Sequence, residues 1–160
     1  LHSFPTRRSS DLPAVFELLR ETGFPGLKVL HFAFAPDGSS IYLPHRYEKN
    51  CLVYTGTHDN DTTIGWFGEL GEAERHFMDD YLGGVDEHCV HWQLIRLAMR
   101  SVADVCIIPM QDVLGLPSSA RMNKPQTSQG NWRWRLAPGQ FDEATRQKLA
   151  HMTWLYGRSS

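Results

Sequence analysis

The sequence predicts an α/β fold built on a parallel sheet. Three apolar runs of strand length, residues 27–34, 51–57 and 105–110, are continuous rather than alternating, and amphipathic segments separate them. Continuous apolar strands joined by helices are typical of parallel sheets, because both faces of such a sheet are covered. A closed (β/α)8 barrel needs eight strands and about 250 residues. The pattern of this 160-residue chain therefore leaves both an open sheet and part of a barrel open.

The helical segments have clear boundaries. The strongest is residues 86–101, which begins with two acidic residues and has an apolar stripe opposite Arg96 and Arg100. The stripe consists of Val90, Leu94, Leu97, Ala98 and Ser101. Further helices are predicted over residues 13–22, over residues 72–82 and over residues 141–156. A short helix between the first two is capped by Asp61 or Thr62 and ended by Gly68. The inner side of the last helix is predicted to consist of Phe141, Leu149, Met152 and Leu155.

Residues 1–12 fit none of these patterns. The segment Ser3–Leu12 reads like the translation of a common sequencing-adapter oligonucleotide, and no apolar stretch follows its arginine pair, as a secretory signal would require. We interpret residues 1–12 as an artefact of sequence assembly and expect the natural sequence to begin near Pro13.

The composition narrows the class of protein. With a formal net charge of -2, the chain gives no electrostatic reason to expect a nucleic-acid or membrane partner, and no apolar run approaches the roughly 20 residues that span a bilayer. Its three cysteines, Cys51, Cys89 and Cys106, are far apart and form no C-x-x-C pair. Reduced thiols in a cytoplasmic protein are the simplest interpretation. The composition gives no argument for a cofactor.

One His and two carboxylates stand where the second strand ends, in the sequence Thr57-His58-Asp59-Asn60-Asp61. α/β folds place their active sites at such strand ends. His58 and Asp59 face opposite sides unless the backbone turns between them. Two other interpretations remain: a turn that caps the next helix through Asp61, or a divalent metal site of a nucleotide-sugar glycosyltransferase that uses Asp59 and Asp61.

Other polar and aromatic residues are candidates for ligand binding. Gln111 directly follows the third strand, and therefore belongs to the same edge of the sheet as His58. Asn123 and Asn131 lie in a segment without periodicity, as ligand-binding loop residues often do. Because apolar sugar faces stack on aromatic rings, a non-catalytic glucan-binding module is a further alternative, using Trp66, Trp132 and Trp134.

Several blocks resemble one enzyme family. They are residues 28–34 (KVLHFAF), 54–63 (YTGTHDNDTT), 109–116 (PMQDVLGL), 121–123 (RMN) and 130–135 (GNWRWR). In this order, across about residues 13–158, they are similar to the amylomaltases, which are the 4-α-glucanotransferases of glycoside hydrolase family 77. The resemblance implies a (β/α)8 TIM barrel in which the three apolar runs are strands six to eight. Residues 13–160 are then the C-terminal portion of the catalytic barrel.

The resemblance also implies a reaction, the retaining transfer of α-1,4-glucan segments between maltooligosaccharides, without a cofactor. Asp59 matches the family's transition-state-stabilising carboxylate, and His58 its sugar-binding neighbour. Asn123 and Phe32 match glucan contacts, and Asp61, Gln111 and Asn131 are further substrate-binding candidates. The family's nucleophile and its acid/base Glu lie upstream, the Glu at a position where Ser10 stands here. We therefore expect no transferase activity from this chain alone.

Overall fold

The computed structural model describes residues 13–159, so the prediction for residues 1–12 lies outside it. In chain order, the helices and strands are α1 (Pro13–Thr22), β1 (Gly26–Val29), β2 (Cys51–Tyr54), α2 (Thr63–Gly68), α3 (Glu72–Leu82), α4 (Val90–Met99), β3 (Val105–Ile107), α5 (Met110–Val113) and α6 (Glu143–Leu155). Within these residues, no helix is both long and apolar enough to cross a membrane.

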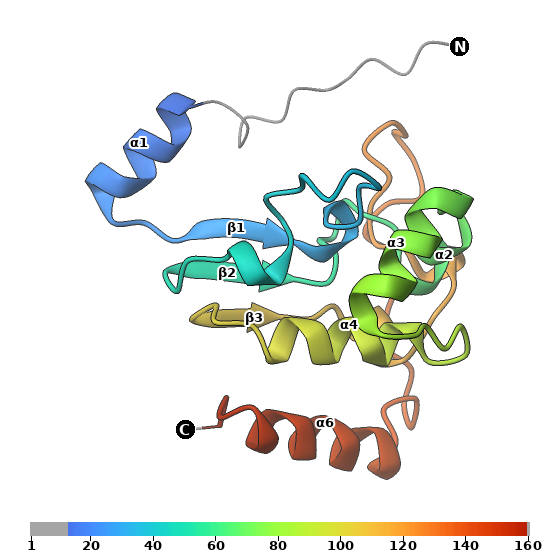
Figure 1. Cartoon of the computed structure of the whole chain (residues 1–160). Coiled ribbons are helices and arrows are strands. Elements are labelled where there is room, and N and C mark those ends of the chain that lie inside the picture. Colours follow the sequence, from blue (N-terminus) through green and yellow to red (C-terminus); the bar gives the residue numbers. More distant parts are fainter. Residues whose placement is uncertain (1–12, 160) are drawn as a thin grey trace.

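The predicted parallel sheet is confirmed. Its strand order is β1-β2-β3, with Lys28 paired to Val53 and Val53 paired to Cys106. All three strands point the same way in Figure 1, toward the end of the molecule where α2 and α3 lie. The segments that leave the strands therefore meet at one edge of the sheet.

The first strand is shorter than predicted. It ends at Val29, and Leu30–Phe32 forms a 3₁₀ turn in which the Ala33 N–H donates to the Leu30 carbonyl at 2.9 Å. Leu30, Ala33 and Phe34 are nevertheless buried in the main core. The apolar run of residues 27–34 therefore correctly indicates burial at these positions but not extended structure, because periodicity alone does not distinguish a buried turn from a buried strand.

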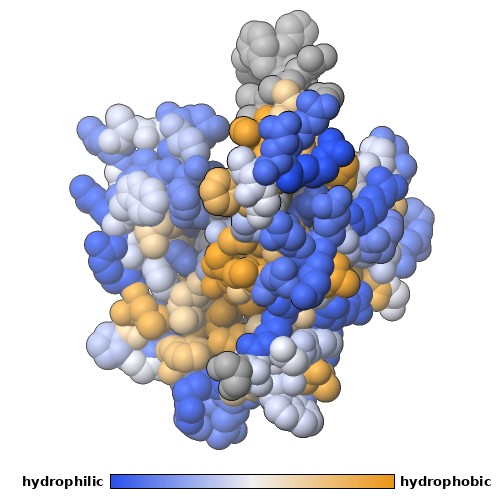
Figure 2. Space-filling model, turned by 90° about the vertical axis from the view of Figure 1, so that its left-hand side faces the viewer, coloured by the Kyte–Doolittle hydropathy of each residue, from blue (hydrophilic) through white to orange (hydrophobic). Residues whose placement is uncertain are grey.

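The third strand is not buried as predicted. Val105 and Ile107 are 44% and 38% exposed, whereas Cys106 between them packs on the core. Alternate side chains of a strand face opposite sides, and the described residues cover only one side of β3. Figure 2 looks at the molecule from the end where the strands begin, and shows apolar surface gathered among polar surfaces there.

Helix α4 joins the two parts of the core. The predicted stripe is buried except for Ser101, which is half-buried beyond the end of the helix, and Arg96 and Arg100 are exposed. The helix begins at Val90 because Asp86 first forms a turn with the His88 N–H. On its other side, Ile95 packs near Met152 of α6. The prediction that Leu155 faces inward is wrong, since Leu155 is 47% exposed. The next residue, Tyr156, packs on this part of the core instead, and its hydroxyl accepts a hydrogen bond from Arg96 at 2.8 Å.

Candidate functional site

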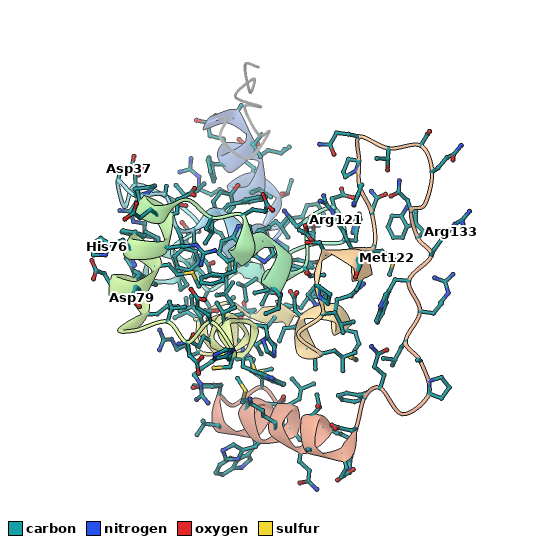
Figure 3. All side chains as sticks on the ribbon, turned by 90° about the vertical axis from the view of Figure 1, so that its right-hand side faces the viewer. Asp37, His76, Asp79, Arg121, Met122 and Arg133 are labelled. Atoms are coloured by element: carbon teal, nitrogen blue, oxygen red, sulfur yellow. The ribbon has the colours of Figure 1, made fainter. Side chains whose placement is uncertain are left out.

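A pocket of about 250 Å³ opens at the carboxyl edge of the sheet. The loop that leaves β2, residues 56–62, is hereafter called the Asp59 loop, and all of its residues except Asp59 line the pocket. The other walls are the segment after β3 and the side chains of Arg121, Met122 and Trp132. Figure 3 shows Arg121 and Met122 toward the middle of the molecule, and Arg133 on the outer loop pointing away from it. The pocket therefore lies where two neighbouring parallel strands deliver their loops.

Asn60 folds the Asp59 loop into a turn. Its Oδ1 accepts hydrogen bonds from the Thr57 N–H at 2.9 Å and from the Thr57 hydroxyl at 2.8 Å, while the Asn60 N–H donates to the Thr57 carbonyl at 3.1 Å. Asn favours such local turns because its side chain bonds the nearby backbone. The turn brings His58 and Asp59 to one side, where His58 Nε2 lies 3.3 Å from Asp59 Oδ1.

The Asp59 carboxylate is held from the opposite loop. Asn123 Nδ2 donates to Asp59 Oδ1 at 2.6 Å, and the Asn123 N–H donates to the His58 carbonyl at 3.1 Å. Arg121 Nη2 donates to the Asp59 carbonyl at 2.6 Å. About half of each side chain stays exposed, 56% for His58 and 51% for Asp59. Asp59 is therefore fixed in position and still open to a ligand.

Asp61 has different partners. Its Oδ2 lies 3.9 Å from Arg121 Nη1, and its Oδ1 accepts from the Thr62 N–H at 2.7 Å. Of the two predicted caps of α2, the structure uses Thr62, whose hydroxyl accepts from the Gly65 N–H at 3.2 Å. Over residues 13–159, no three His, Cys, Asp or Glu side chains gather in a way that would hold a metal ion.

Trp132 forms one wall of the pocket and has an unusual backbone. Its φ of 62° lies in the left-handed region, which costs a non-glycine residue about 1–3 kcal/mol. The Trp132 N–H donates to the Met122 carbonyl at 2.7 Å, and Arg135 donates to the Trp132 carbonyl at 2.9 Å. These bonds hold the indole ring 5.0 Å from the His58 ring, with half of its surface exposed.

The structure gathers most of the predicted site residues but not all. Gln111 lines the pocket, and its buried amide donates to the Ala120 carbonyl at 3.3 Å. Asn131 instead holds its own loop together, by accepting from the Lys124 N–H and donating to the Thr127 carbonyl, both at 2.9 Å. Phe32 packs on the main core and lines a separate hollow beside Trp66. It does not line the pocket beside Asp59.

The sequence places Asp112 at the same end of the sheet as His58 and Asp59, but it assigns no role to the groups beneath the Asp59 loop. Asp112 is 2% exposed, and its carboxylate accepts from the Thr55 hydroxyl at 2.5 Å and from the Thr63 N–H at 2.7 Å. Burial raises the pKa of Asp112, and these hydrogen bonds oppose that rise. His31 is buried too, and burial lowers its pKa to about 3. A signal was present: a threonine flanks the loop on each side, and Asp112 follows the third strand.

These features define an α/β protein with a pocket at the carboxyl edge of a parallel sheet, where α/β enzymes hold their catalytic groups. The family model of 4-alpha-glucanotransferases matches residues 11–141. The 4-alpha-glucanotransferases of Synechocystis sp. and Clostridium butyricum are 51% and 46% identical over 91% and 89% of this chain. This chain belongs to the 4-alpha-glucanotransferase family, as the sequence resemblance predicted.

The chain spans 29% of the length of each of these two relatives. Among solved structures, an amylomaltase from Streptococcus agalactiae in complex with acarbose is similar, with a TM-score of 0.88 and 34% sequence identity. The likeness covers 93% of this chain and 30% of that one. The similarity therefore extends to nearly all of this chain and to less than a third of each of these proteins.

Proposed function

We propose that this chain carries the glucan-binding and transition-state-stabilising part of a 4-alpha-glucanotransferase active site. In the full-length protein, that site transfers α-1,4-glucan segments between maltooligosaccharides. The observation that carries the proposal is the fixed, half-exposed carboxylate of Asp59, held by His58 and Asn123 at the edge of the sheet. Family membership supports the choice of substrate.

The geometry suits this reaction physically. A retaining glycosyl transfer passes through a transition state with oxocarbenium character, and an anion beside the developing positive charge stabilises it. Asp59 Oδ1 is already engaged by Asn123, so little reorganisation accompanies the reaction. His58 beside it is a donor for sugar hydroxyls, and the Trp132 ring offers a flat apolar surface to a sugar face.

We further infer that β1, β2 and β3 are the sixth to eighth strands of a (β/α)8 barrel. Their parallel order and the site at their carboxyl ends support this. The exposed Val105 and Ile107 lie on the face of β3 that a closed barrel would cover. The nucleophile and the acid/base are then expected outside this chain, so it transfers no glucan by itself. We propose a cytoplasmic location, supported by the odd number of separated cysteines.

A chimeric enzyme tests the proposal. The 147-residue segment of the Synechocystis enzyme that aligns with this chain is replaced by this chain's residues. The chimera should release glucose from maltotriose, whereas the 160-residue chain alone should release none. In the chimera, Asp59→Asn should lower kcat by about 100- to 1,000-fold while acarbose still binds. A folded chimera without transferase activity, or an Asp59→Asn variant with normal kcat, would contradict the proposal.

A further inference from the structure

A buried carboxylate joins the two ends of the Asp59 loop. Thr55 is the residue before the loop and Thr63 is the residue after it. Asp112 Oδ2 accepts from the Thr55 hydroxyl at 2.5 Å, and Asp112 Oδ1 accepts from the Thr63 N–H at 2.7 Å. One side chain, on α5 after the neighbouring strand, therefore closes the base of the loop that presents Asp59.

The same segment of chain also holds the tip of the loop. Arg121 and Asn123 follow Asp112 by about ten residues, and they bond the backbone and carboxylate of Asp59. The segment from Asp112 to Asn123 therefore fixes the loop at its base and at its tip. Asp59 can move only if one of these attachments breaks. The hydrogen bonds at the base of the loop therefore help to fix the direction of the Asp59 carboxylate.

His31 blocks the other direction of movement. Its ring stacks on Trp66 at 4.5 Å with an interplanar angle of 5°, and its Nε2 lies 3.0 Å from the Thr63 hydroxyl. A Cβ atom on Gly56 would lie 2.5 Å from His31 Cε1, so the loop backbone already touches the ring. The loop is therefore held between the Asp112 carboxylate and a fixed imidazole.

We propose that Asp112 is a positioning residue for catalysis. It acts through Thr55 and Thr63, and its task is to keep the Asp59 carboxylate at the place where the sugar charge develops. The catalytic consequence rests on the proposed function. A displacement of reacting groups by about 1 Å can lower the rate by about 100-fold. A loosened loop base should therefore lower kcat, even though Asp112 is 2% exposed.

Hydrogen exchange measured by mass spectrometry on this chain tests the structural half. Asp112→Ala removes both acceptors, and peptides covering residues 55–63 should exchange roughly tenfold faster or more. Asp112→Asn keeps an oxygen for the Thr63 N–H and offers an amide N–H to the Thr55 hydroxyl, so it should restore most of the protection. Val113→Ala is the matched control, because Val113 lies on the same helix but packs on Met152 and Ile95. Equal exchange in the unaltered chain and Asp112→Ala, whether fast or slow, overturns the proposal.

Kinetics in the chimera test the catalytic half. Asp112→Ala should lower kcat for maltotriose by about 10- to 100-fold with KM changed less than about threefold, and Asp112→Asn should recover most of it. Val113→Ala should lower the melting temperature but not kcat. A loss of kcat in Val113→Ala equal to that in Asp112→Ala would reduce Asp112 to a structural role. If the unaltered chimera is folded but inactive, the proposed function fails, while the exchange experiment still decides whether Asp112 holds the loop.

Discussion

Gly56 has no room for a side chain, and this makes a quantitative prediction. A Cβ atom there would lie 2.5 Å from His31 Cε1, 2.7 Å from His31 Nδ1 and 3.3 Å from the Asn60 Cβ. Real Cβ atoms do not approach other atoms below 3.0 Å. The φ of Gly56 is not in the left-handed region, so the contact with His31 is the main steric obstacle to Gly56→Ala.

His31 cannot easily make space. It is 6% exposed, it stacks on Trp66, and it bonds Thr63. Forcing extra atoms into a packed site costs about 1–3 kcal/mol, because side chains leave their preferred rotamers and the backbone shifts. We therefore expect Gly56→Ala to lower the free energy of unfolding by about 2–3 kcal/mol, the upper part of that range, because the His31 ring is held on two sides. A decrease below about 1 kcal/mol would be smaller than this reasoning allows.

Urea unfolding followed by tryptophan fluorescence measures this change, and Gly68→Ala is the matched control. Gly68 ends α2, and a Cβ there meets nothing within 4 Å. Ala is favoured over Gly in a helix by up to about 1 kcal/mol, so Gly68→Ala should be neutral or stabilising. If Gly56→Ala unfolds at the same urea concentration as Gly68→Ala, then His31 does not confine the loop as the geometry indicates.

Two further predictions concern His31 and Trp132. The pKa of His31 is lowered from 6.5 to about 3 by burial, so its neutral form contributes stability that is fully present above pH 6.5 and is lost as pH falls toward 3. Relative to His31→Gln, the unfolding free energy of the unaltered chain should fall by about 1.4 kcal/mol for each pH unit lowered between pH 6 and 4. The raised pKa of Asp112 has the opposite effect, but that effect is common to both proteins. Parallel curves of unfolding free energy against pH for the two proteins would therefore contradict the prediction. Trp132→Ala in the chimera should weaken acarbose binding by about 10-fold, measured by calorimetry, because it removes a half-exposed ring from the pocket wall. The control is Trp154→Ala, which removes an exposed ring on α6 and should leave acarbose binding unchanged.

The sequence predicted what depends on local pattern. The parallel sheet, the buried apolar residues of α4 and a cap of α2 at Asp61 or Thr62 follow from periodicity and capping chemistry, which are properties of neighbouring residues. The extended form of Leu30–Phe32 and the burial of Val105 were predicted wrongly. Both depend on which face of a segment finds a neighbour from elsewhere in the chain, and an apolar run does not record that.

The site follows the same division. His58 and Asp59 were singled out because they adjoin in sequence, and Gln111 because it follows a strand. Asp112, by contrast, acts on Thr55 and Thr63, which lie 57 and 49 residues away. Such a contact arises only when two parallel strands bring their exit loops to one edge. The sequence can place Asp112 at that edge, but it does not identify the partners of its carboxylate.

The Asp59 loop is held in place by contacts from the segment that follows β3 as well as by its own turn. A turn closed by Asn60 alone fixes the shape of the Asp59 loop but not its place relative to the sheet. The place is set by hydrogen bonds from Arg121 and Asn123 at the tip and to Asp112 at the base. Electrostatic stabilisation of a transition state requires that a charge be placed before the reaction begins. The attachments between the loops of β2 and β3 are therefore as much a requirement for the proposed role of Asp59 as the carboxylate itself.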